Sequence, residues 1–204
     1  RNCAVKVTKD NVEKVEYENL GGYVWNDQII NREFDFCESN ECDYKTFIAN
    51  ISNNDASRIR SMHSTIGFLL QGYKDKGFCP AVIIAYQLVS ADTQVLTFDD
   101  VKKNFIFENL FSVITEGITL EKKNKDAIKI PYEQSPKVVI TTNYAIKGKG
   151  NSFDRRKWEL ELTRYYGDGF TPYDEFGRLL FDDWDEGEWC RFDNYMLNNL
   201  KFFM

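Results

Sequence analysis

The sequence predicts a mixed α/β protein with a helical N-terminal lobe, and two observations support this prediction. Apolar residues recur at spacings of three and four along residues 59–73, which gives a helix one apolar face. Apolar runs rich in β-branched residues follow at 81–84, 95–98 and 138–142, and such runs are typical of strands buried in a parallel sheet. The helical pattern therefore comes first along the chain, and the strand pattern comes second.

The N-terminal lobe is expected to cover residues 1–80. Short β-like runs such as residues 23–25 alternate with polar breaks at its start. A first helix is expected at Asp43–Ile51. A second is expected from Asp55 to about Tyr73, because aspartate is a favoured N-cap residue. Glycine and proline then break the chain where the lobe ends.

The α/β core, with C-terminal helices, is expected to cover residues 81–204. Its expected elements are, in chain order, strands at 81–84 and 95–98, a helix at 105–115, a hairpin of strands 118–122 and 127–130, strands at 138–142 and 158–162, and helices at 173–181 and 186–203. The run 158–162 alternates in polarity, which favours an edge strand. Trp189, Phe192, Met196 and Leu200 share one face of the last helix and are expected to pack in the core.

Composition limits the possible functions. The 204 residues include 26 basic and 32 acidic side chains, for a net charge of −6. A protein that binds nucleic acid with its whole surface is expected to be basic, so any such contact must be a local patch. No stretch approaches the ~20 consecutive apolar residues that span a membrane. Because the sequence begins at Arg1 without an initiator methionine, we expect a fragment or a trimmed product.

The five cysteines are odd in number and scattered along the chain, which favours a reduced cytosolic protein with free thiols. Cys37 and Cys42 are the only close pair, and His63 is the only histidine. A zinc site needs two close pairs or more histidines, so zinc is disfavoured.

Polar side chains follow two of the expected strands. Asp99 and Asp100 end the run 95–98, and Asn143 ends the run 138–142. Ligands bind at this edge of open α/β sheets, where one carboxylate can hold Mg²⁺ and another can orient an attacking water. Taken singly, each signal is weak, since paired acids also form solvated turns and asparagine commonly ends a strand.

Two basic segments are further candidates for binding. Arg155 and Arg156 lie in one turn, and the planar guanidinium suits phosphate oxygens. Lys122, Lys123, Asn124 and Lys125 lie at the tip of the expected hairpin, where cations can contact a nucleic-acid backbone. The alternatives are a solvated basic turn and a hairpin that its lysines keep soluble.

The order of these features resembles superfamily 3 helicases of the phage and plasmid primase-helicase type. An acid pair, a helix, a basic-tipped hairpin, a strand ending in asparagine and an arginine turn follow one another. The segment Gly117–Asn143 is similar to the hairpin and sensor-1 segment of viral replicative helicases, and the likeness extends from about Tyr23 to the C-terminus. The resemblance implies a P-loop (AAA+-like) ATPase core.

The resemblance also assigns roles. Asp99 and Asp100 match the Walker B acids, with Asp99 at the metal, and Asn143 matches sensor 1. Arg155 or Arg156 matches the arginine finger that acts on a neighbour's ATP. Lys123, Asn124 and Lys125 match the hairpin tip that contacts single-stranded DNA, and Lys122 beside them is also expected to bind DNA.

The cofactors and partners implied in this way are ATP with Mg²⁺, single-stranded DNA, and further copies of the chain in a ring, commonly a hexamer. The implied location is the cytoplasm of a bacterial host or a phage-infected cell.

One element of the family pattern is missing. The phosphate-binding Walker A loop needs Gly-x-x-x-x-Gly-Lys-[Ser/Thr], and no such run occurs. In the family it falls where this chain joins Ile84 to Ala85, so the central sheet is expected to be incomplete. A gene deletion, an engineered or misassembled chain, and a partial sequence would each explain the gap. Without the loop, nucleotide affinity and hydrolysis are expected to collapse.

Three interpretations follow. The chain represents an ATP-dependent DNA helicase domain of a phage or plasmid replication protein, inactive in ATP hydrolysis as it stands. Alternatively, it is a non-catalytic remnant that binds DNA or oligomerises. The third is an unrelated α/β interaction domain.

Overall fold

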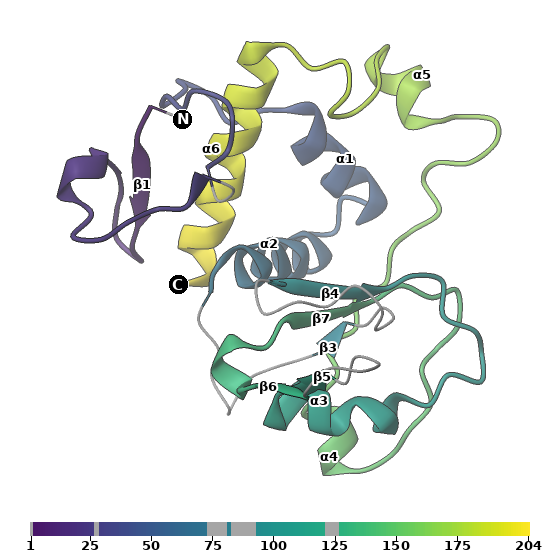
Figure 1. The fold of residues 1–204 in the computed structure, drawn as a ribbon. Helices are drawn as coiled ribbons and strands as arrows, with labels where there is room; N and C mark the ends of the chain where they lie inside the picture. Colours follow the sequence, from purple (N-terminus) through teal and green to yellow (C-terminus); the bar gives the residue numbers. More distant parts are fainter. Residues whose placement is uncertain (1, 27–28, 73–80, 83–92, 121–126) are drawn as a thin grey trace. The chain divides into compact units, whose positions relative to one another are not determined.

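A computed structural model describes residues 2–26, 29–72, 81–82, 93–120 and 127–204 of the chain. Its elements confirm a mixed α/β protein (Figure 1). The strands are β1 (Ala4–Val7), β2 (Val12–Val15), β3 (Ala81–Val82), β4 (Val95–Phe98), β5 (Ile118–Leu120), β6 (Ile128–Ile130) and β7 (Lys137–Ile140). The helices are η1 (Tyr17–Asn19), α1 (Asp43–Ile51), α2 (Ala56–Leu70), η4 (Phe107–Leu110), α3 (Phe111–Glu116), η5 (Tyr132–Gln134), α4 (Asn151–Asp154), α5 (Pro172–Phe176) and α6 (Glu186–Phe203).

The chain forms two compact units. The first unit combines Arg1–Gln71 with Leu160–Met204, and the second unit is Gly72–Glu159. This division differs from the expected lobes 1–80 and 81–204, because α6 packs along α2 and α1 in the first unit. The amphipathic face of α6 is therefore buried by helices more than a hundred residues earlier in the chain.

The helices of the first unit begin at the predicted residues. The Asp55 carboxylate accepts the N–H of Arg58 at 2.8 Å and caps α2. The Asp185 carboxylate accepts the N–H of Glu188 at 2.7 Å and caps α6. Each cap satisfies a backbone donor that the first helical turn leaves unpaired, so α1, α2 and α6 confirm the predicted helices.

Aromatic rings fill the space between these helices. The ring of Tyr44 on α1 lies 5.4 Å from that of Phe192 on α6 in an edge-on contact. Trp184 is 7% exposed, and its ring lies 5.0 Å from that of Trp189. Edge-on aromatic pairs add to the stabilisation that burial alone provides. Trp189 and Phe192 therefore pack among aromatic rings as expected, but both side chains stay half-buried.

His63, which lies on α2, packs among aromatic rings. Its ring lies 5.6 Å from that of Tyr195, and burial, followed by repulsion from Lys45, lowers the pKa of His63 from its ordinary value of 6.5. The unfolded chain therefore binds a proton at a pH where the folded chain does not, so stability falls as pH drops through about 6.5.

We expect the urea-unfolding free energy of the intact chain to decrease between pH 7.5 and 5.5, and His63→Gln to remove most of that decrease. An unchanged pH dependence in the His63→Gln protein would assign it to other groups.

Three predicted elements differ in the structure. Trp158–Leu162 forms no strand: Trp158 is 41% and Leu162 56% exposed, so the alternating pattern gives no buried face. The run Tyr23–Trp25 is not a strand either, and the Tyr23 side chain is fully exposed. The helix expected at 173–181 ends at Phe176, because Gly177 takes the left-handed conformation (φ 66°) that ends helices.

The expectation of free thiols is wrong for two cysteines. Cys37 and Cys190 form a disulfide, with Cα atoms 6.4 Å apart. The Asn194 side-chain amide donates to the Asp35 carbonyl at 2.8 Å and reinforces the same attachment. The two cysteines are 153 residues apart in the sequence, so the spacing of cysteines along the chain does not indicate that they pair. Of the other described cysteines, Cys3 and Cys42 are free.

The second unit is built on a parallel sheet in the order β3-β7-β4. Strand β7 is central, as its apolar sequence predicts, and β5 and β6 form the predicted antiparallel hairpin. The core of this unit is Leu96, Phe107, Leu110, Val113, Ile114, Ile118, Ile130, Val138 and Phe153.

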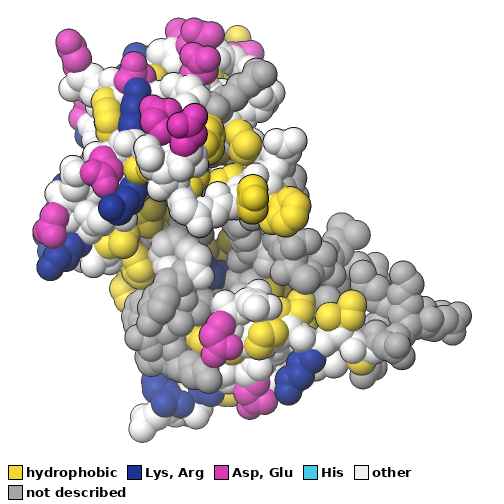
Figure 2. All heavy atoms as spheres, turned by 60° about the vertical axis from the view of Figure 1, so that its left-hand side comes forward, with side chains coloured by type: hydrophobic (Ala, Val, Ile, Leu, Met, Phe, Trp, Pro, Cys, Tyr) yellow, Lys and Arg dark blue, Asp and Glu magenta, His cyan; other side chains and the backbone are white. Residues whose placement is uncertain are grey.

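The two units differ in charge. The first unit carries 12 basic and 21 acidic residues, a net charge of −9, and the second carries 14 basic and 11 acidic residues, a net charge of +3. On the face in Figure 2, Asp and Glu side chains are prominent over the first unit. The acidity of the chain therefore resides in the first unit. No helix within the described ranges has the length and apolarity needed to cross a membrane.

Candidate functional site: the acidic edge of the second unit

The parallel pairing of β4 and β7 fixes the position of the candidate site. Phe98 pairs with Ile140, the last residue of each strand, so residues 99–100 and 141–143 leave the sheet at the same edge. The N–H of Val101 donates to the Thr141 carbonyl at 2.9 Å and extends the pairing past the strand ends. The carboxyl edge of a parallel sheet is where open α/β proteins bind ligands.

A hydrogen-bond network joins the polar residues at this edge. The Thr141 hydroxyl donates to the Asp99 carboxylate at 2.5 Å and accepts the N–H of Asp100 at 2.8 Å. The Asn143 amide donates to the Asp100 carboxylate at 3.1 Å. We call Asp99, Asp100, Thr141 and Asn143 the acidic edge. The network holds two carboxylates in fixed positions, and both residues remain exposed to solvent.

Asp100 adopts an uncommon backbone conformation. Its φ is +49°, in the left-handed region that aspartate tolerates better than most residues. This conformation costs about 1 kcal/mol or more and persists only where the surroundings hold it, and such residues cluster at functional sites. Here the Thr141 hydroxyl accepts the Asp100 N–H, while the Asn143 amide binds its carboxylate.

The acidic edge can support a weakly held divalent cation. Mg²⁺ is commonly bound by one or two carboxylates, with water and ligand phosphates completing its shell. Within residues 2–26, 29–72, 81–82, 93–120 and 127–204, no three His, Cys, Asp or Glu side chains gather as a metal site. A cation at Asp99 and Asp100 would therefore need water or a phosphate as its other ligands.

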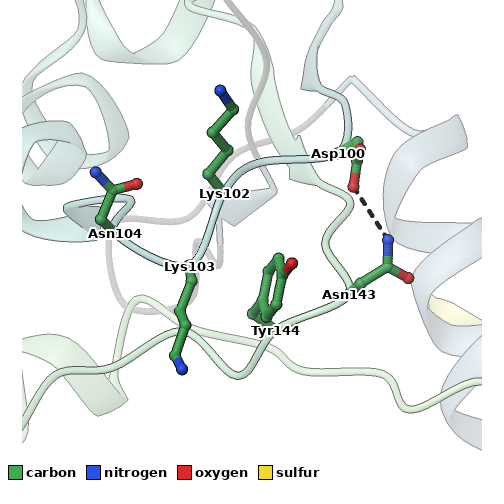
Figure 3. A pocket seen from close by; sticks show the side chains of 6 residues that line it. All are labelled: Asp100, Lys102, Lys103, Asn104, Asn143 and Tyr144. Carbon is green, nitrogen blue, oxygen red and sulfur yellow. Dashed lines mark hydrogen bonds between the residues drawn. The ribbon is translucent and has the colours of Figure 1, made fainter.

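A hollow of about 520 Å³ lies beside the acidic edge (Figure 3). Its lining residues are Asp100, Lys102, Lys103, Asn104, Asn143 and Tyr144. Sequence reasoning identified Asp100 and Asn143 but missed the other four, and it also missed Thr141. Two signals in the sequence point to them: the Lys-Lys-Asn run just after the acid pair, and the tyrosine that follows Asn143.

The two arginine candidates have different environments. The Arg156 guanidinium lies 4.7 Å from the centre of the Phe111 ring and donates to the Ser152 carbonyl at 2.8 Å. Arg155 is exposed, and its guanidinium makes no hydrogen bond or ion pair with other described residues. Arg156 is therefore held within its own unit, whereas Arg155 is available to a partner.

Two parts of the sequence prediction lie outside the described residues. They are the hairpin tip, with Lys122, Lys123, Asn124 and Lys125, and the Ile84–Ala85 junction.

Comparisons with protein-family models, curated proteins and solved structures found no match to this chain.

Proposed function

We propose that this chain is a superfamily 3 DNA helicase domain of a phage or plasmid replication protein, inactive in ATP hydrolysis in the form given by this sequence. The observation that supports the proposal is the acidic edge. There the Asn143 amide, which follows β7, donates to the carboxylate of Asp100, which follows the neighbouring parallel strand β4, at 3.1 Å. In this proposal the chain has a P-loop type core, and it acts in the cytoplasm of the infected or plasmid-bearing bacterium.

Each residue has a distinct role in this proposal. Asp99 holds Mg²⁺, Asp100 orients the attacking water, and Asn143 contacts the terminal phosphate or that water. Arg155 serves as the arginine finger toward the neighbouring copy in a ring, because its guanidinium is exposed while that of Arg156 is packed on Phe111.

The missing Walker A loop removes the backbone donors and the lysine that hold phosphates. We therefore expect the intact chain to show no ATP turnover above the buffer rate. DNA-stimulated turnover that Asp99→Asn abolishes would contradict the proposed inactivity. Sequencing the encoding DNA across Ile84–Ala85 separates the explanations, because a recovered phosphate-binding loop restores the enzyme and an uninterrupted junction favours a remnant.

The DNA contact proposed for the hairpin is tested by Lys123→Ala with Lys125→Ala. Each lost phosphate contact lowers the slope of binding against salt by about 0.7 for single strands, so we expect the slope to fall by about 1.4. Fluorescence anisotropy of a labelled 15-nucleotide oligo-dT measures the slope. The control is Lys9→Ala with Arg60→Ala, which removes two exposed charges from the first unit. An unchanged affinity and slope in the hairpin variant would remove the hairpin assignment.

The second candidate is a non-catalytic remnant that keeps the DNA-binding or oligomer surfaces. The absent loop and the positive charge of the second unit favour it. ATP hydrolysis does not distinguish it from the first candidate, because both lack the phosphate-binding loop and neither is expected to hydrolyse ATP. The encoding DNA across Ile84–Ala85 does, because a recovered phosphate-binding loop would mark an intact enzyme and an uninterrupted junction a remnant.

A further inference from the structure

The hollow beside the acidic edge combines an exposed aromatic ring with cations. Tyr144 is 49% exposed, and Lys102, Lys103 and Asn104 belong to the facing segment of the lining. In Figure 3 the Lys102 and Lys103 side chains point in opposite directions. The Asp100 carboxylate accepts a hydrogen bond from Asn143 and points away from both lysine amines. The hollow thus has a basic part and an acidic part.

The Thr142 hydroxyl holds the two lining segments together. It donates to the Val101 carbonyl at 2.8 Å and accepts the N–H of Tyr144 at 3.1 Å. The first bond fixes the chain just before Lys102, and the second fixes the backbone of Tyr144. The backbone segments that carry the ring and the cations are therefore tied to each other.

The segment after Tyr144 adds two more cations. Lys147 and Lys149 are exposed and flank Gly148, where a Cβ would lie 2.0 Å from the Phe153 ring. Because Phe153 belongs to the core, this contact holds the segment against the unit. Residues 99–106 and 143–150 together carry four lysines and two aspartates, and none of the four lysines forms an ion pair with another described residue.

We propose that the basic part of this hollow binds single-stranded DNA, with a base stacked on Tyr144 and backbone phosphates at Lys102 and Lys103, apart from the nucleotide roles proposed for Asp100 and Asn143 in its acidic part. Stacking on an exposed aromatic ring beside unpaired cations is the general chemistry of single-strand recognition. The diverging lysines suit successive phosphates of one strand better than the clustered phosphates of a free nucleotide. Tyr144, Lys102 and Lys103 are exposed, as contact with a polymer that passes over the surface requires.

This inference rests on the proposed function for the choice of DNA as the polymer, but it assigns DNA to a site other than the hairpin tip. The local charge supports it, since the second unit is positive in a chain that is negative as a whole.

The test is the affinity of the intact chain for a labelled 15-nucleotide oligo-dT, measured by anisotropy without nucleotide. Tyr144→Ala should weaken binding roughly tenfold, and Tyr144→Phe should stay within about twofold because the stacking face remains. Lys102→Ala with Lys103→Ala should lower the salt slope by about 1.4. Tyr173→Ala, which removes a ring of similar exposure from the first unit, is the matched control and should leave the affinity unchanged.

The outcomes separate this inference from the proposed function. If Tyr144→Ala and the lysine pair leave binding unchanged while Lys123→Ala with Lys125→Ala weakens it, the hollow site is overturned and the hairpin assignment stands. If Tyr144→Ala instead weakens binding of ATP and leaves the oligonucleotide unaffected, the hollow is a nucleotide site and the inference fails. Absence of any DNA binding by the intact chain overturns both DNA assignments, but it leaves the metal role of Asp99 to its own measurement.

Discussion

Replacing Glu188 with alanine should lower the free energy of unfolding of the first unit by about 1.5–3 kcal/mol, because it removes a buried carboxylate that accepts hydrogen bonds from a backbone N–H and from two arginines. Glu188 is 2% exposed. Its carboxylate accepts the N–H of Asp43 at 2.6 Å and lies 2.6 Å from Arg191 and 3.2 Å from Arg178. Arg178 also donates to Asp43 at 2.7 Å. One carboxylate therefore joins the start of α1, the start of α6 and the segment after α5.

Urea unfolding monitored by tryptophan fluorescence measures this effect, since Trp184 and Trp189 lie beside Glu188 in the chain and pack together. Urea is preferred to guanidinium chloride, which as a salt screens ion pairs. The matched control is Glu186→Ala, an exposed acid two residues away, which should change stability by no more than about 0.5 kcal/mol. Equal effects of the two substitutions would show that the network adds nothing to stability.

Phe107→Ala should destabilise the second unit by about 3–5 kcal/mol. The Phe107 side chain is 0% exposed, and its ring meets those of Phe111 at 5.5 Å and Phe153 at 5.2 Å. Truncation would leave a cavity at the centre of the core that supports the sheet. Since whole domains are stable by only about 5–15 kcal/mol, the loss would take much of the stability of this unit.

Hydrogen exchange of peptides that cover β4 and β7 reports on this unit separately from the first. We expect much faster exchange in the Phe107→Ala protein and little change in the Ile106→Ala protein, because the neighbouring Ile106 is 58% exposed. Unaltered protection of β4 and β7 in the Phe107→Ala protein would mean that this ring does not support the sheet.

Local patterns were sufficient to predict the individual elements. The helix bounds of α1 and α6 and the strand bounds of β4 agree with the sequence prediction, since caps and apolar periodicity act over a few residues. The meeting of Asp100 with Asn143 was also predictable, because the carboxyl ends of neighbouring parallel strands share an edge. The catalytic roles of these residues stay predictions.

Features that depend on distant parts of the chain were not predictable in this way. The packing of α6 on α2 and the Cys37–Cys190 disulfide depend on the path of the whole chain, and spacing carries no signal for either. Thr141 was overlooked because threonine is common in strands of every kind. Its role depends on Asp99 and Asp100 lying opposite it. The alternating run that starts at Trp158 gave a wrong strand prediction, because alternation produces a strand only where one face is buried.

The central claim is that the acidic edge is a divalent-cation site of helicase type, and paramagnetic broadening by Mn²⁺ in the ¹⁵N-labelled intact chain tests it most directly. Mn²⁺ shares the oxygen ligands that Mg²⁺ prefers. Substoichiometric Mn²⁺ should broaden the amide signals of Asp99, Asp100 and Asn143 first. Asp99→Asn should abolish that broadening, while Asp182→Asn, an exposed acid in the first unit, should leave it intact. Broadening that is absent from these amides, or that persists in the Asp99→Asn protein, would contradict the claim.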